Sequence, residues 1–138
     1  MQRFEGTRIK IHLFGNTAFD LLANAPLHSC DTAMWARAGG WGRVMYWNPR
    51  KEGENKADRF YLEEYIREND EEQAIKFSTC EYRREFEEYL WSRFGLHHED
   101  LIGPGAAKNK MLVNTYFFVQ LEKTITEIHR QKGFDTNE

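Results

Sequence analysis

The sequence predicts an α/β fold in which a parallel βαβ unit, residues 1–49, is followed by a helical C-terminal subdomain, residues 50–138. Two apolar runs separated by a short crossover indicate the βαβ unit, because strands joined in this way are typically parallel neighbours. Apolar residues at helical spacing indicate the second part, and 138 residues suffice for one compact unit with one core. Ligands of parallel sheets bind beyond the carboxyl ends of the strands, so we expect any site there.

The first strand is predicted over residues 8–15, where polar and apolar side chains alternate before a glycine. Thr17, with Asp20 three residues later, resembles a capping box that begins a short helix. Pro26 ends this helix because proline is not tolerated in a helix interior.

The second strand is predicted over residues 29–34, and a further short strand over residues 43–47. Alternation along the second strand divides its side chains between two faces. One face carries Cys30, Thr32 and Met34, and the other carries Ser29, Asp31 and Ala33.

The second half reads as a solvated linker over residues 50–57 and then as helices. Helical spacing predicts a helix over 57–68, and a capping box at Ser78 predicts another that runs to Phe94. The last helix is predicted over 107–131. Its expected apolar stripe comprises Leu112, Tyr116, Val119, Ile125 and Ile128.

The bulk properties favour a cytoplasmic protein. The net charge of −3 gives no global case for nucleic-acid binding, so such contacts need a local patch. No apolar run approaches the roughly 18 residues of a membrane span, and we expect no membrane association. Two cysteines, Cys30 and Cys80, fit a reducing compartment better than a disulfide framework.

Asp31, in the second strand, is the candidate catalytic residue, as a nucleophilic carboxylate or, alternatively, as a structural capping or ion-paired group. Phe14 and Gly15 either line a substrate pocket or form a core aromatic and a turn. Arg37 and Arg43 flank a glycine-rich stretch, which suits phosphate binding or a hairpin with solvated arginines.

These positions also match a known pattern. His12-Leu13-Phe14-Gly15 is similar to a strand-ending Tyr/His-Leu-Met-Gly motif, and Asp31 is followed by Arg37 six positions on and Gly42 five beyond that. The arrangement resembles the last two barrel strands of the tRNA-guanine transglycosylases. Trp91-Ser92-Arg93, followed by His97-His98, resembles a stretch of that family's C-terminal subdomain.

The resemblance implies that the chain corresponds to the last strands of a TIM barrel and to the C-terminal subdomain of such a pentosyltransferase. It implies exchange of guanine for a 7-deazapurine in tRNA or DNA through a covalent intermediate on Asp31, with substrate contacts at Phe14 and Gly15 and nucleic-acid contacts at Arg37, Gly42 and Arg43. The family's Cys-x-Cys-x-x-Cys zinc triplet is absent before Trp91, so we expect a zinc-free relative without a cofactor.

Because most barrel strands are lacking, we expect the chain to be inactive alone and to associate as a homodimer or with a chain that carries the rest of the barrel. The alternative is a non-catalytic nucleic-acid-binding or dimerisation module.

Overall fold

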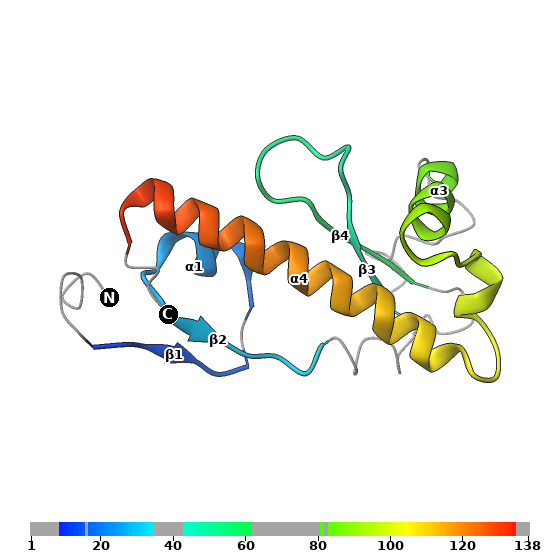
Figure 1. The fold of residues 1–138 in the computed structure, drawn as a ribbon, viewed down its shortest axis with the longest axis horizontal. Coiled ribbons are helices and arrows are strands. Elements are labelled where there is room, and N and C mark those ends of the chain that lie inside the picture. The colour runs from blue at the N-terminus through cyan, green and yellow to red at the C-terminus, as the bar shows by residue number, and fades with distance from the viewer. Residues whose placement is uncertain (1–8, 16, 35–42, 62–80, 82, 135–138) are drawn as a thin grey trace.

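The computed structural model describes residues 9–15, 17–34, 43–61, 81 and 83–134. Helix α4 (Ala106–Lys132) is the longest element, and the remaining elements lie along it (Figure 1). Before it come, in chain order, β1 (His12–Leu13), α1 (Phe19–Asn24), β2 (Ser29–Cys30), β3 (Arg43–Trp47), β4 (Ala57–Tyr61), α3 (Arg83–Phe94) and the 3₁₀ helix η5 (His98–Leu101). The fold is mixed α/β, and none of the described helices is long and apolar enough to cross a membrane.

The parallel βαβ unit is confirmed, although its strands are short. β1 and β2 pair in parallel, with His12 opposite Ser29 and Leu13 opposite Cys30, and α1 lies between them in the sequence. The predicted alternation continues beyond β2, because residues 30, 32 and 34 are partly buried whereas residues 29, 31 and 33 are exposed. The predicted capping box is wrong: the N-cap of α1 is Ala18, which makes no side-chain cap.

The helix predicted over residues 57–68 is also wrong where the structure describes it. Ala57–Tyr61 forms β4, antiparallel to β3 in a register that runs from Arg43 opposite Tyr61 to Trp47 opposite Ala57. The presumed linker is the hairpin loop: Asn48 donates its backbone N–H to the Lys56 carbonyl at 2.8 Å. β3 has the bounds predicted for it, and hydrogen bonding to β3 makes residues 57–61 a strand despite their helical spacing of apolar residues. Residues 62–68 lie outside the described residues.

The helical half has an aromatic cluster at its centre. The Tyr46 ring makes edge-to-face contacts with Phe86 and Tyr89, at centroid distances of 5.0 and 4.7 Å. Such edge-to-face pairs stabilise the fold beyond the effect of the apolar area that they bury. α3 ends as predicted at Phe94, and the next residue, Gly95, has a φ of +64° that suits glycine and donates its N–H to the Trp91 carbonyl. The cluster consists of Val44, Tyr46, Phe86, Tyr89, Leu90, Leu101 and Val113.

Helix α4 spans almost the predicted range but presents a different face to the core. Leu112 and Val119, which were expected in the buried stripe, are 50% and 39% exposed, whereas Ile125 and Ile128 are buried as predicted. Asn114 decides the orientation, because its Oδ1 accepts the Met45 N–H at 2.8 Å. This contact places α4 over the outer edge of β3, a place where unpaired backbone groups need cover.

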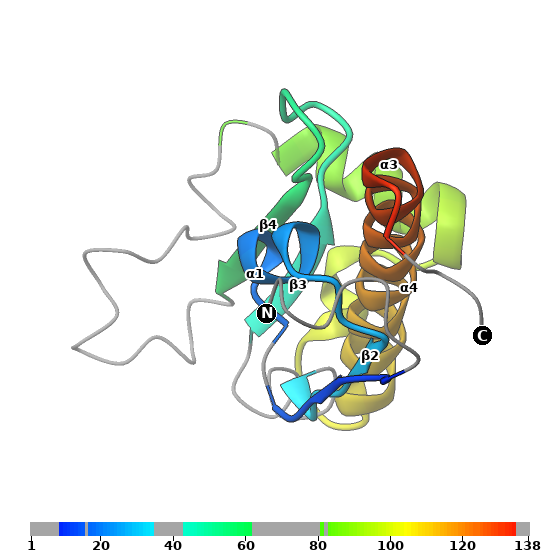
Figure 2. The same cartoon turned by 90° about the vertical axis from the view of Figure 1, so that its left-hand side faces the viewer.

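The C-terminal half of α4 packs against α1 and β2 in a second cluster. Figure 2 shows β1 and β2 below α1 and this part of α4. His129 Nε2 lies 2.5 Å from the Leu22 carbonyl oxygen, and Lys132 Nζ donates to the Ala23 carbonyl at 3.0 Å. These two polar contacts join α1 to the last turns of α4. The buried members are Leu22, Ala23, Ala25, Leu27, Phe117, Leu121, Ile125 and Ile128.

Candidate functional site

The carboxylate of Asp31 joins the ends of the two parallel strands. Asp31 directly follows β2, and its Oδ1 accepts the backbone N–H of Gly15, just after β1, at 2.8 Å. Gly15 has a φ of +67°, in the left-handed region that side chains disfavour, so glycine suits the turn that aims its N–H at the carboxylate. Both residues therefore lie at the carboxyl edge of the sheet, where the sequence predicted a site.

His12 lies on the same side of this edge. Its Nε2 is 3.5 Å from Asp31 Oδ2, and its Nδ1 is 2.8 Å from Ser29 Oγ. The parallel register sets His12 opposite Ser29, and alternation puts Ser29 and Asp31 on one face of β2. His12 is not among the site residues predicted from the sequence. A parallel register with His12 opposite Ser29, together with alternation along β2, would have placed His12 beside Asp31.

Asp31 is exposed, and its pKa is lowered below the ordinary value. The hydrogen bond from the Gly15 backbone is the main cause and outweighs partial desolvation, which acts in the opposite direction; the His12 side chain lowers the pKa further. The carboxylate is therefore ionised at neutral pH, as a nucleophile must be.

Phe14 is an exposed aromatic side chain beside this carboxylate. Its side chain is 78% exposed, and its ring meets that of His12 at a centroid distance of 4.4 Å and an angle of 73°. The core-aromatic alternative for Phe14 is therefore wrong. An exposed ring at a strand end offers a face on which a nucleobase could stack.

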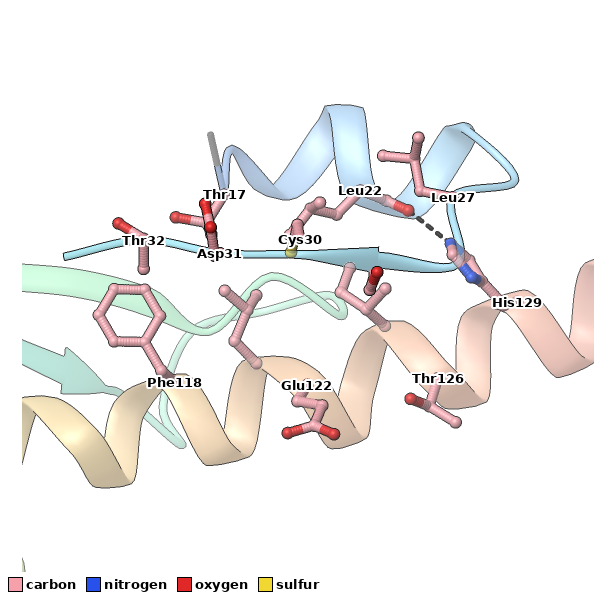
Figure 3. A pocket seen from close by; sticks show the side chains of 13 residues that line it. Thr17, Leu22, Leu27, Cys30, Asp31, Thr32, Phe118, Glu122, Thr126 and His129 are labelled. Carbon is pink, nitrogen blue, oxygen red and sulfur yellow. Dashed lines mark hydrogen bonds between the residues drawn. The ribbon is translucent and has the colours of Figure 1, made fainter. Parts of the chain in front are cut away.

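A cleft of about 340 Å³ runs between β2 and the C-terminal half of α4 (Figure 3). Four consecutive residues, 29–32, line it from the β2 side, and Phe118 and Glu122 face them from α4. Since successive strand residues point to opposite faces, four in a row indicate a cleft beside the strand edge rather than over one face. No β1 residue lines it.

The cleft has an acidic, mostly apolar character. Burial raises the pKa of the Cys30 thiol, and the carboxylates of Asp31 and Glu122 raise it further. Cys30 is accordingly a neutral, partly buried thiol, in keeping with its interpretation as a small apolar residue. The carboxylates of Asp31 and Glu122 are the acidic groups that line the cleft.

The arginines predicted to contact nucleic acid are only partly covered by the structure. Arg37 and Gly42 lie outside the described residues, and their role stays a prediction. Arg43 begins β3, and its carbonyl oxygen accepts a 3.4 Å hydrogen bond from Asn114 Nδ2. This contact is on the N-terminal half of α4, whereas the Asp31 cleft is lined by α4 residues from Phe118 onward.

The adjacent histidines are engaged in separate contacts. His98 Nδ1 lies 2.9 Å from Glu87 Oε1, while the His97 ring stacks on Trp91 with a centroid distance of 5.1 Å. Across the described ranges, no group of three or more histidine, cysteine, aspartate or glutamate side chains is arranged to hold a metal ion.

Comparison with known proteins does not identify a family: no family model, curated protein or solved structure matches the chain.

Proposed function

We propose that this chain supplies the nucleophile and part of the nucleic-acid surface for a transglycosylase-type base exchange, as a C-terminal portion of a tRNA-guanine-transglycosylase-like enzyme. In the first step an oxygen of Asp31 attacks the anomeric carbon of a nucleotide. The bond from this carbon to the base nitrogen breaks, and its electron pair leaves with the base. The released base takes up a proton. A 7-deazapurine nitrogen that has given up its own proton then attacks the same carbon and displaces the Asp31 carboxylate; a general base on the remaining barrel strands would move both protons.

One observation carries this proposal: Asp31 is an exposed, ionised carboxylate held at the carboxyl ends of two parallel strands. The 2.8 Å bond from Gly15 fixes one oxygen, while the other faces His12 and solvent. A structural carboxylate that only caps a loop does not need an exposed face, but a nucleophile does. Phe14, beside it, supports the binding of a planar base.

The small sheet supports association with the remaining strands of a barrel. Parallel sheets are normally buried on both faces and have more than two strands, whereas β1 and β2 pair with no third strand among the described residues. A barrel closed by another chain would bring base-binding residues to Asp31.

The test is exchange of labelled guanine into tRNA and into DNA. The full chain is assayed alone and together with the polypeptide encoded by the neighbouring gene. We expect no exchange by the chain alone, because an isolated nucleophile cannot stabilise the leaving base, and exchange by the pair. Asp31→Ala should abolish it, whereas the matched control Asp20→Ala, another exposed aspartate, should not. Exchange that survives Asp31→Ala contradicts the proposal.

A second candidate is a non-catalytic dimerisation module, and the exposed side of α4 favours it. Leu112 and Val119 lie seven residues apart, about two helical turns, and are both exposed. If this face joins two copies, Leu112→Asp should shift the sedimentation of the chain from dimer to monomer. A wild-type chain that sediments as a monomer excludes this candidate.

A further inference from the structure

A carboxylate that attacks a carbon atom must be held in one orientation. Free rotation of an exposed aspartate spreads its oxygens over several rotamers, and small displacements of a reacting group are costly in rate. The Gly15 N–H fixes Oδ1 of Asp31 but leaves the carboxylate plane free to turn about that bond. A second contact is required, and His12 Nε2, 3.5 Å from Oδ2, is in the place to provide it.

The His12 ring is itself held from two sides. Ser29 Oγ lies 2.8 Å from Nδ1, and the Phe14 ring packs against the imidazole at 4.4 Å. If the serine hydroxyl donates to Nδ1, the neutral ring carries its proton on Nε2, directed at Asp31. Ser29 thereby selects the form of His12 whose Nε2–H points toward the carboxylate.

From this arrangement we propose that His12, set by Ser29, is a positioning residue for the nucleophile Asp31; the inference rests on the proposed function. At 3.5 Å the contact is longer than an ordinary N–H···O hydrogen bond, so it orients Oδ2 electrostatically and leaves its lone pairs available for attack. The same contact favours the ionised carboxylate before attack and again after the ester is broken.

The first test follows the Asp31 carboxyl carbon by NMR during an acid titration of the full chain. In His12→Leu the titration midpoint should rise, because the N–H group beside Oδ2 is lost. In His12→Gln the rise should be smaller, since the amide still offers an N–H. His98→Gln is the matched control, because it removes a histidine that contacts Glu87 instead, and it should leave the midpoint unchanged. An unchanged midpoint in His12→Leu overturns the proposal.

The second test uses the guanine-exchange assay described above. His12→Leu should lower kcat by about 10²-fold with little change in KM, the cost expected for a misplaced reacting group. Ser29→Ala should act in the same direction, and His12→Gln should recover most of the rate. Equal impairment by His12→Leu and His12→Gln contradicts a positioning role. Exchange that is absent in wild type, or that persists in Asp31→Ala, contradicts the proposed function, whereas the NMR titration judges the His12 contact independently.

Discussion

The two hydrophobic clusters that lie along α4 differ in how completely they are closed. In the aromatic cluster Val44, Leu90 and Val113 have no exposed surface. The cluster of α1, β2 and the C-terminal half of α4 keeps a little exposure at every member and borders a cleft of about 340 Å³. The cluster at the N-terminal half of α4 is closed to solvent, whereas the cluster at its C-terminal half borders the cleft beside Asp31. Stability and the proposed chemistry are therefore separated along one helix.

The clusters also differ in their ionisable groups. The aromatic cluster buries the hydroxyl groups of Tyr46 and Tyr89, for which burial raises the pKa, to about 12 for Tyr46. The open cluster borders Asp31, whose pKa is lowered. The two ends should therefore respond to opposite extremes of pH.

The largest expected effect comes from truncating a leucine in each cluster. Leu90→Ala should lower the free energy of unfolding by about 4 kcal/mol, because the closed aromatic core cannot refill the space. Leu27→Ala should cost about 2 kcal/mol, since Leu27 lies at the wall of an open cleft and its truncation widens that cleft instead of leaving a closed cavity. Urea denaturation measures both. Equal losses, or a larger loss for Leu27→Ala, would contradict the difference in closure.

An intermediate effect is expected in alkali. A tyrosine whose pKa is higher in the folded state stabilises the fold fully below its unfolded pKa, about 10, and this contribution is lost as the pH rises through 12. For Tyr46 the loss amounts to about 2–3 kcal/mol. Tyr46→Phe, which keeps the ring, should unfold at higher pH than wild type when followed by circular dichroism. Coincident alkaline transitions would show that the buried hydroxyl has no part in them.

The smallest effect is expected in acid. Because the pKa of Asp31 is depressed in the fold, its stabilising contribution is present above the ordinary aspartate value and is lost as the pH falls through the lower folded value. Asp31→Asn should therefore show a flatter dependence of stability on pH below about 4. The difference should shrink in high salt, since the group is exposed. Equal slopes at low salt would argue against the Gly15 and His12 contacts.

Local pattern was sufficient to predict several elements. The strand over residues 43–47 is observed with the same bounds, and its buried residues Val44 and Tyr46 alternate with partly buried ones, as side chains on the two faces of a strand do. The last helix was placed within one residue at each end. The parallel pairing of β1 and β2 and the position of Asp31 at their carboxyl edge were also predicted.

Other features depended on partners far away in the sequence. The spacing over residues 57–68 indicates a helix, but hydrogen bonds from β3 make its first part a strand. The apolar stripe of α4 was misassigned because Asn114, a polar residue, faces inward to reach the Met45 backbone. Hydrophobic periodicity ignores such a contact, since it counts an asparagine as solvent-facing.

The sequence by itself determined the βαβ order, the long final helix and the carboxylate at the strand end, because these follow from periodicity and strand alternation within short windows. Only the tertiary structure decided that His12 faces Asp31, that Phe14 is exposed, and that a cleft opens beside β2. The physical reason is that a site requires the register between strands and the packing of a helix against them. Both depend on contacts between residues far apart in the sequence, such as Leu22 and His129.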